Sequence, residues 1–261
     1  MNSVQAKKHL GQHFLNDKNI AKKIVDSLTP NLGFSKVLEV GPGMGVLSDF
    51  LIENQDIELH LIDIDTESIA YLENKYPSLG KRLIHGDFLK LNFQELFNEK
   101  FAIIGNFPYN ISSQILFKIL DNKDQVPQTV GMFQKEVAER CTAQPGSKSY
   151  GILSVLLQAY FDIKYLFTVK AGAFNPPPKV LSGVIELRRN NVRKLDCNEA
   201  LFKKVVKAAF NQRRKTLRNA LSVILSKEKL NANPIDFLSL RAERLSVEDF
   251  IKLTNQIEKA L

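Results

Sequence analysis

Short apolar runs alternate with segments of helical periodicity along most of this 261-residue chain, and this alternation constrains the fold more than any other feature. The runs Val37–Val40 and Phe101–Ile104 are typical of buried strands. Between such runs, apolar residues recur at helical spacing, as at Ile115, Leu116 and Ile119. Because strands separated by helices pair in parallel through right-handed crossovers, the pattern predicts an open α/β sheet.

The expected elements follow one another in a regular order. The first is a helix that Asp17 caps and that ends near Thr29 and Pro30. The strands that we expect lie at residues 37–40, 59–64, 82–85, 101–104, 129–133, 164–169 and 180–187. The helices between them lie at residues 46–52, 67–75, from 112 or 113, up to 140, and 151–161. A connection too short for a crossover helix joins the last two strands, so we expect them to pair antiparallel at the sheet edge.

The texture of the sequence changes after Arg188. Strand patterns end there, and helical periodicity dominates the remaining residues. We therefore predict two domains, an α/β domain at residues 1–188 and a small all-helical domain at residues 189–261. The chain length is compatible with one large α/β domain and an appendage.

The balance of charges favours a polyanionic partner. The chain has 36 Lys and Arg against 28 Asp and Glu, a formal charge of +8 and a pI of about 9.3. Four basic residues are expected to begin a helix in the small domain and suit phosphate contacts: Arg213, Arg214, Lys215 and Arg218. A solvated basic surface without a nucleic-acid partner is the alternative.

Neither the cysteines nor the histidines have metal-site spacing. Cys141 and Cys197 form no paired motif, which predicts free thiols in a reducing cytoplasm. His9 and His13 lie four residues apart without a third ligand, so we expect no metal. No apolar stretch is long enough for a bilayer and residues 1–10 lack a signal-peptide core, so we expect a cytoplasmic protein without a membrane partner.

Glycine and acidic residues stand where the first three strands end. In open α/β sheets, ligands bind beyond these carboxyl ends. The turn Gly41–Gly45 allows close approach to the backbone, but the third glycine of a dinucleotide fingerprint is replaced by Val46. Asp63 is placed to accept the ribose hydroxyls of a nucleoside, and Asp87 to accept from an adenine amine. Taken singly, each residue is equally compatible with a turn or a helix cap.

Asn106-Phe107-Pro108-Tyr109 follows the fourth strand and suits a reaction at the exocyclic amine of adenine. That amine is a poor nucleophile, because its lone pair is delocalised into the ring. The Asn106 side-chain oxygen supplies one acceptor for its N–H groups, and the Phe107 carbonyl supplies another because Pro108 favours an extended residue before it. Tyr109 adds a stacking face. A turn that leaves a buried strand is the alternative interpretation.

The ordered set of glycine turn, two acids and Asn-x-Pro-Tyr indicates an S-adenosylmethionine-dependent amino-methyltransferase. Together with further motifs, it closely resembles the ribosomal RNA adenine N6-dimethyltransferases, which dimethylate two adjacent adenosines near the 3′ end of small-subunit rRNA. The resemblance spans nearly the whole chain. The further motifs are Leu10-Gly11-Gln12-His13-Phe14-Leu15, Phe174 followed by Pro176, Pro178, Lys179, Val180 and Ser182, and Phe210-Asn211-Gln212-Arg213-Arg214-Lys215.

This resemblance implies a Rossmann-like methyltransferase fold, a mostly parallel seven-stranded sheet with one antiparallel strand, plus the helical domain. It implies a 30S subunit precursor as partner; the sequence is silent on oligomeric state, and a monomer is our working expectation. The implied cofactor contacts come from His13, Leu15, Gly41, Asp63, Asp87 and Asn106. Family members often carry Asn at 13, Glu at 63 and Leu at 107, exchanges that keep hydrogen-bonding character or the backbone carbonyl.

The target base is expected to lie between Tyr109 and Phe174, while a loop aromatic packed on the sheet rim is the alternative for Phe174. A ribonucleotide base must be unpaired or flipped to reach such a site. Three other functions remain open: adenine methylation of DNA or large-subunit rRNA, non-catalytic ribosome assembly, and nicotinamide-dependent oxidoreduction. The loop spacing disfavours the last, and the retained acceptors argue against the second as the sole role.

Overall fold

The computed structural model describes residues 4–29 and 32–261, and the chain divides into two compact units. The first unit combines Met1–Ala138 with Asp162–Arg189, and the second combines Glu139–Phe161 with Asn190–Leu261. Residues 139–161, which the sequence assigns to the first domain, therefore cluster with the C-terminal residues. The domain boundary between residues 188 and 189 stays a prediction.

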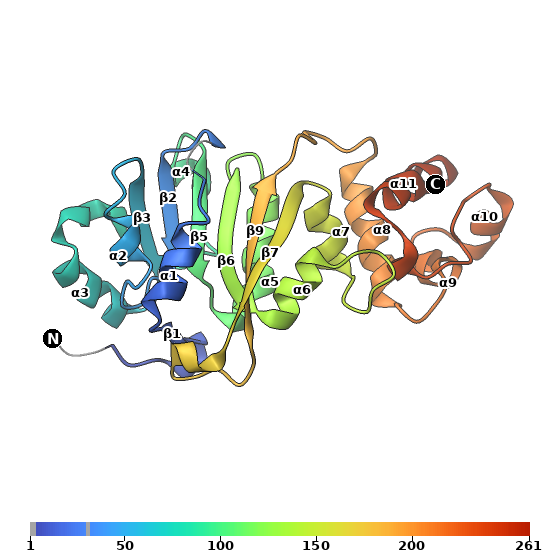
Figure 1. Ribbon diagram of the computed structural model, residues 1–261. Coiled ribbons are helices and arrows are strands. Elements are labelled where there is room, and N and C mark those ends of the chain that lie inside the picture. The colour runs from blue at the N-terminus through green and yellow to red at the C-terminus, as the bar shows by residue number, and fades with distance from the viewer. Residues whose placement is uncertain (1–3, 30–31) are drawn as a thin grey trace. The chain divides into compact units, whose positions relative to one another are not determined.

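A seven-stranded sheet forms the centre of the first unit (Figure 1), with the strand order β4-β3-β2-β5-β6-β9-β7. Its strands are β2 (Lys36–Val40), β3 (Glu58–Asp63), β4 (Leu83–His85), β5 (Phe101–Asn106), β6 (Gln128–Gln134), β7 (Phe161–Val169) and β9 (Ser182–Arg189). The pairs from β4 to β6 are parallel, and β9 runs antiparallel to β6. The predicted fold class is confirmed, as are the adjacency of β9 and β7 and the edge position of β7.

The central strand β5 shows why the sequence forms this sheet. Residues 101–105 are all buried, as expected for a parallel strand covered on both faces. On one face, the buried side chains of β2, β3, β5 and β6 join those of α1 (Lys18–Val25), α2 (Ser48–Leu51) and α3 (Thr66–Lys75) in one core cluster. Near the start of β5, Phe93 of α4 (Phe93–Leu96) meets the Phe101 ring edge-on at 5.1 Å between centroids.

The predicted start of the first helix is confirmed, but its predicted end and the predicted length of the next helix are wrong. The Asp17 carboxylate accepts hydrogen bonds from the backbone N–H groups of Asn19 and Ile20 and caps α1 as predicted. The helix ends at Val25 rather than near Thr29, and Pro30 lies outside the described residues. The expected helix at residues 46–52 is reduced to the single turn of α2.

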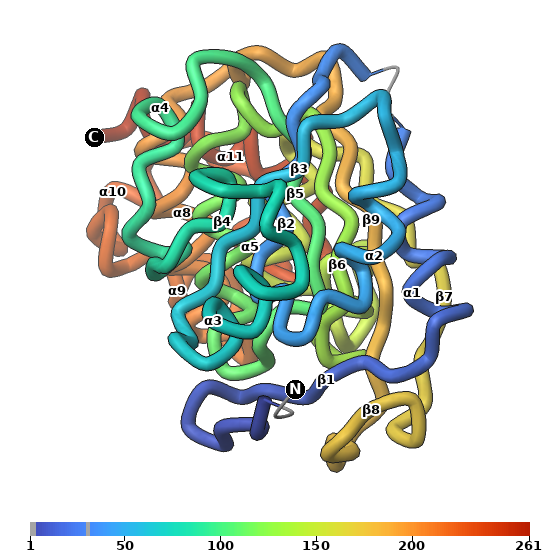
Figure 2. The backbone as a smooth tube through the Cα atoms, turned by 90° about the vertical axis from the view of Figure 1, so that its left-hand side faces the viewer, coloured from blue at the N-terminus to red at the C-terminus, as the bar shows by residue number. Residues whose placement is uncertain are grey.

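The chain contains one strand pair that no local pattern indicates. The two-residue strands β1 (Phe14–Leu15) and β8 (Phe174–Asn175) pair antiparallel, with Phe14 opposite Asn175 and Leu15 opposite Phe174. Figure 2 shows this N-terminal segment running beside the connection between β7 and β9. The pairing therefore ties the N-terminal motif to the proline-rich connection.

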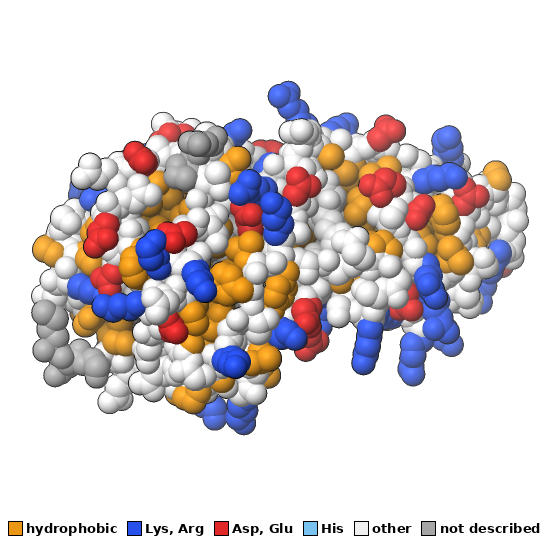
Figure 3. All heavy atoms as spheres, viewed as in Figure 1, with side chains coloured by type: hydrophobic (Ala, Val, Ile, Leu, Met, Phe, Trp, Pro, Cys, Tyr) orange, Lys and Arg blue, Asp and Glu red, His pale blue; other side chains and the backbone are white. Residues whose placement is uncertain are grey.

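The second unit is helical. Its helices are α7 (Ile152–Gln158), α8 (Glu199–Asn211), α9 (Leu217–Ala220), α10 (Lys227–Ala232) and α11 (Val247–Ala260). The helix α6 (Lys135–Thr142) spans the division between the units, and α5 (Ser112–Asp121) belongs to the first unit. An aromatic cluster holds the unit together, because the Phe210 ring lies 6.0 Å from Tyr150 and 5.9 Å from Phe250 between centroids. Lys and Arg side chains project from its surface around the lower end of α8 and around α9 (Figure 3).

Candidate active site at the strand ends

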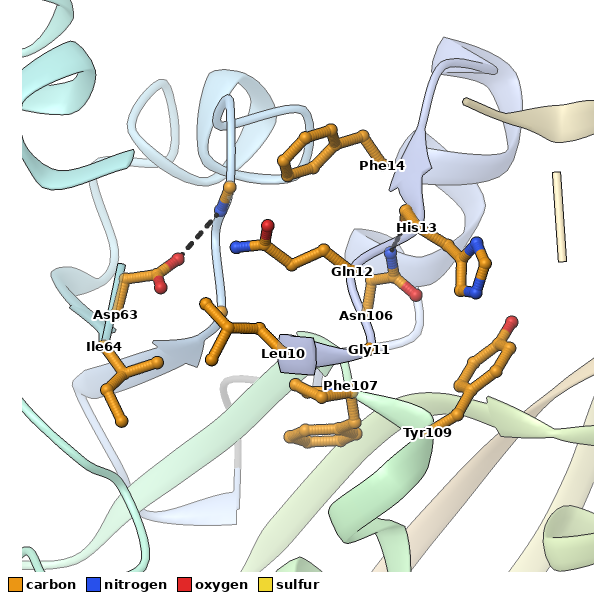
Figure 4. A pocket seen from close by; sticks show the side chains of 13 residues that line it. Leu10, Gly11, Gln12, His13, Phe14, Asp63, Ile64, Asn106, Phe107 and Tyr109 are labelled. Atoms are coloured by element: carbon orange, nitrogen blue, oxygen red, sulfur yellow. Dashed lines mark hydrogen bonds between the residues drawn. The ribbon is translucent and has the colours of Figure 1, made fainter. Parts of the chain in front are cut away.

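The carboxyl ends of the parallel strands bring the predicted site residues to one edge of the sheet. Asp63 ends β3, Asn106 ends β5, and Gly41 follows β2. A cavity of about 50 Å³ lies between them and the N-terminal segment (Figure 4). It is lined by Leu10, Gly11, Gln12, His13, Phe14, Gly41, Gly43, Asp63, Ile64, Asn106, Phe107, Pro108 and Tyr109.

Two of the glycines in the turn after β2 line the cavity. Gly41 and Gly43 have positive φ angles of 67° and 56°, which side chains with a Cβ rarely adopt. A Cβ on Gly43 would lie 2.8 Å from the ring of Phe14, so the N-terminal segment packs directly on the turn. The Gly41 N–H donates to the Ile62 carbonyl at 2.9 Å, so the turn is anchored to the neighbouring strand β3.

Asp63 is a buried acceptor with spare capacity. Its side chain is enclosed, with 6 % of the residue exposed, and it accepts hydrogen bonds from the backbone N–H of Gly43 at 3.3 Å and of Asp65 at 2.9 Å. Burial raises its pKa, and these N–H groups oppose the rise. The backbone N–H of Ile64 also acts on this carboxylate, and because a carboxylate has about four acceptor positions, it retains capacity for a donor such as a ribose hydroxyl.

Asp87 lies on the loop after β4 and is held by that loop. Its Oδ1 accepts from the backbone N–H of Leu89 at 2.9 Å. Lys118 of α5 fixes the same loop by donating to the carbonyls of Leu89 at 3.0 Å and Leu91 at 2.7 Å. Asp87 is at the predicted edge of the sheet but does not line the 50 Å³ cavity, so its contact with the cofactor adenine stays a prediction.

Asn106 and Phe107 both line the cavity. The Asn106 Nδ2 donates to the carbonyl of His13 at 2.7 Å, which directs the amide so that Oδ1 is the open acceptor. Within residues 4–29 and 32–261, neither Asn106 Oδ1 nor the Phe107 carbonyl accepts a hydrogen bond. The Phe107 backbone is firmly positioned, because its N–H donates to Met132 at 3.1 Å and its ring stacks on Phe133 at 4.8 Å between centroids.

Tyr109 and Phe174 are not brought together as predicted. The Tyr109 hydroxyl is hydrogen-bonded to Ser182, and its ring lies 5.4 Å from the His13 ring between centroids. Phe174 belongs to the core cluster with Leu15 and is 4 % exposed, and it lines neither the cavity nor the groove beside it. The role of Phe174 in stacking stays a prediction, while the aromatic ring beside Tyr109 in this structure is that of His13.

The N-terminal segment is fastened by contacts that the sequence reasoning did not identify. Lys7 Nζ lies 2.5 Å from Asp65 Oδ1 and 3.0 Å from Glu67, and Gln12 Nε2 donates to Asp65 Oδ2 at 3.1 Å. The side chain of Asp65 is fully buried. Gln12 lines the cavity and was not among the predicted site residues, although it stands inside the Leu10–Leu15 motif that could have indicated it.

The basic residues of the second unit differ in availability. The prediction that they begin a helix is wrong for residues 213–215, because Gln212 leaves helical geometry and ends α8. Arg213 is engaged, as its Nε donates to Glu243 at 2.9 Å, and Arg218 is hydrogen-bonded to Asn231. Arg214 and Lys215 are exposed in the turn before α9.

Comparison with known proteins decides the family. The family described as "Ribosomal RNA adenine dimethylase" matches residues 3–259 of the chain. The chain belongs to this family. The "Ribosomal RNA small subunit methyltransferase A" of Cytophaga hutchinsonii is 58% identical over 98% of this chain and 99% of its own. The protein of the same name from Bacteroides thetaiotaomicron is 55% identical over 100% of this chain and 97% of its own.

Solved structures agree with this membership. A dimethyladenosine transferase from Plasmodium falciparum matches with a TM-score of 0.78 at 25% identity, over 95% of this chain and 98% of its own. The 23S rRNA methyltransferase ErmE shares the fold, with a TM-score of 0.68 at 22% identity over 94% of this chain and 99% of its own. As a member of the dimethylase family, the chain is an rRNA adenine methyltransferase that uses S-adenosylmethionine.

The residues at the cavity fit this cofactor. Gly41 is partly exposed and has room where a Cβ would stand, which allows close approach to its backbone, and Asp63 retains an acceptor position for a ribose. Among residues 4–29 and 32–261, no group of three His, Cys, Asp or Glu side chains is arranged to hold a metal ion. Across the same residues, no helix combines the length and the apolar character needed to cross a membrane.

Proposed function

We propose that this protein transfers methyl groups from S-adenosylmethionine to N6 of two adjacent adenosines in the 3′-terminal hairpin of small-subunit rRNA. Its substrate is a 30S subunit precursor in the cytoplasm, and the protein acts as a monomer. The names of the relatives that are more than half identical over nearly the whole chain support the small subunit as the site of action.

The single observation that carries the proposal is the pair of open acceptors at the end of β5. Asn106 and Phe107 are adjacent along the chain, and both line the cavity together with Pro108 and Tyr109. An NH₂ group offers two N–H donors, which is the complement of two acceptor oxygens. Accepting both N–H groups holds these bonds out of the purine plane, so the lone pair is localised on the nitrogen and can attack.

The residues then need to supply orientation rather than a strong base. The bound cofactor supplies an electrophilic methyl group on a positively charged sulfur. Asn106 and Phe107 hold the adenine nitrogen in the attacking direction, an effect of positioning that is worth large rate factors. Alkylation makes the departing N–H acidic enough for water to remove its proton, so no covalent enzyme intermediate is required.

The second transfer places a different demand on the same acceptors. After the first methylation only one N–H remains, so one oxygen loses its partner and the cavity must accommodate a methyl group there. A backbone carbonyl and a side-chain amide are both neutral, so the unpaired acceptor costs less than an unpaired carboxylate would.

Product mapping tests the proposed function. We would incubate the protein with labelled S-adenosylmethionine and small subunits that lack this modification, and then locate the methylated nucleotides by mass spectrometry. The expected result is dimethyladenosine at two neighbouring positions near the 3′ end of the rRNA. Methylation confined to large-subunit rRNA or to DNA would contradict the proposal.

A further inference from the structure

A groove of about 680 Å³ adjoins the catalytic cavity and shares a wall with it. Four residues line both hollows: Gly11, Gln12, His13 and Tyr109. The groove extends away from the cavity along the proline-rich connection and the end of β6, and all of its lining residues belong to the first unit. A polynucleotide with one base in the cavity would therefore have its neighbouring nucleotide at this groove.

Apolar residues of the connection between β8 and β9 form one side of the groove. They are Pro176, Pro177, Pro178 and Val180. The first of these prolines is held in place, because its carbonyl lies 2.8 Å from His13 Nδ1. Val180 is 46% exposed, so its apolar side chain is accessible from solvent. A rigid apolar side of this kind suits contact with the face of a base.

Gln134 is a polar residue of the groove whose side chain has no partner in the described part of the chain. Gln134, the last residue of β6, is half-buried and lines the groove. Its side-chain amide forms no hydrogen bond with any residue of the described ranges 4–29 and 32–261, so its donor and acceptor remain available. A side-chain amide of this type pairs in bidentate fashion with N6 and N7 of adenine.

The charges of the groove match the backbone of a nucleic acid. Lys8 and Lys179 line it and are exposed, and neither forms an ion pair within the described part of the chain. No Asp or Glu side chain lines the groove. Two free ammonium groups beside an apolar wall suit phosphates flanking a stacked base rather than an acidic or neutral metabolite.

We propose that this groove binds the nucleotide next to the target adenosine and that Gln134 reads its base as adenine. This inference rests on the proposed function, because it assigns the second adenosine of the substrate pair to a second place on the enzyme. Tyr109 then separates the two bases, with its hydroxyl fixed by Ser182. The site selects two adjacent adenosines while methylating one at a time.

Rate discrimination tests the role of Gln134. The substrates are unmodified small subunits with the adenosine pair intact, or with either adenosine replaced by uridine. For wild type we expect kcat/KM for the intact pair to exceed that for one replaced form by about tenfold, as for a bidentate base contact. Gln134→Leu should lower this ratio toward one and leave the Kd for S-adenosylmethionine unchanged. An unchanged ratio in the variant, or no discrimination by wild type, would overturn the proposal.

Crosslinking separates failure of this inference from failure of the proposed function. A photoreactive azidoadenosine replaces the nucleotide beside the target, and the crosslinked peptide is identified without any need for turnover. Crosslinks at residues 176–180 or at Gln134 support the groove even if methylation occurs elsewhere. Crosslinks confined to other parts of the chain, or the finding that a protein of the subunit occupies the groove, would overturn it.

The two lysines provide a third measurement. Replacing Lys8 and Lys179 together by Ala should reduce the slope of log Kobs against log salt by about 1.4, since each single-strand phosphate contact contributes about 0.7. Lys81→Ala, an exposed lysine away from the groove, is the matched control. An equal slope in the double variant and the control would show that the groove does not meet phosphates.

Discussion

Glu39 is a carboxyl group in the middle of the sheet, directly before the glycine turn. It is 1% exposed, and its Oε2 accepts a hydrogen bond from the Ser48 hydroxyl at 2.6 Å. Burial raises its pKa to about 8, and the Ser48 hydrogen bond opposes the rise. The native protein therefore keeps a proton on Glu39 at neutral pH that the unfolded chain releases near its usual pKa of 4.5.

This difference predicts that stability falls as the pH rises. Between pH 4.5 and pH 8 the native state binds more protons at Glu39 than the unfolded state does, so the Glu39 contribution is complete below pH 4.5 and is lost toward pH 8. The slope is about 1.4 kcal/mol per pH unit, a loss on the order of 3 kcal/mol between about pH 6 and pH 9.

Glu39→Gln should remove this dependence, because an amide keeps an acceptor for Ser48 and does not ionise. Urea unfolding at several pH values measures the effect. The variant should gain stability relative to wild type as the pH rises, while Glu53→Gln, at an exposed position, should follow the wild-type curve. Parallel curves for wild type and Glu39→Gln would contradict the assignment.

At the scale of elements, the N-terminal segment closes the catalytic cavity. Sites for small molecules and cofactors have volumes of roughly 300–1,000 Å³, much more than the 50 Å³ that residues 10–14 leave. Gln12 projects from the segment between Asp63 and Asn106 (Figure 4), and the Phe14 ring packs on the turn at Gly43. We therefore expect the segment to move outward when the cofactor enters or leaves, and we expect the Lys7–Asp65 ion pair to oppose that movement.

Lys7→Met should accelerate cofactor exchange. With the ion pair removed, the segment opens more often, so association and dissociation rates should both rise several-fold while the Kd changes less. Stopped-flow fluorescence with S-adenosylmethionine measures both rates. Lys22→Met, which removes an exposed ion pair with Asp26 on α1, is the control. Rates equal to those of the control would indicate that the segment does not limit access.

The sequence predicted the elements whose signal is local and missed those that depend on distant partners. The apolar run before Asn106 sufficed to place that residue at the end of β5. The β1–β8 pair could not be predicted, because two residues carry no period and their partners lie far apart along the chain. For the same reason the burial of Phe174 against Leu15 was invisible, since a loop aromatic has the same sequence signal whether it is buried or exposed.

On the scale of the whole molecule, the net charge of +8 provides long-range attraction to RNA, and a few exposed residues provide the contacts. Within the second unit, Arg213 is held by Glu243 and by the Ser147 carbonyl at 3.3 Å. The sequence could not reveal this ion pair, because Glu243 lies far from Arg213 along the chain. The prediction therefore treated the four basic residues alike. Arg214 and Lys215 are the better candidates for phosphate contacts.

The salt dependence of RNA binding tests this distinction. Arg214→Ala and Lys215→Ala should each reduce the slope of log Kobs against log salt by about 0.9 on a duplex hairpin. Arg213→Ala should lower the thermal stability and leave this slope nearly unchanged, because its guanidinium is engaged within the protein. Lys259→Ala is the control at an exposed lysine of α11. Equal slopes for all of these variants would contradict a specific role for the turn before α9.

The central claim is that Asn106 Oδ1 orients the adenine amine. Single-turnover methyl transfer to unmodified small subunits, together with the Kd for S-adenosylmethionine, tests it most directly in Asn106→Ala and in Asn74→Ala, a control at an exposed asparagine. The account predicts that Asn106→Ala lowers the transfer rate by about 100-fold or more and weakens cofactor binding only modestly. A transfer rate equal to that of Asn74→Ala would contradict it.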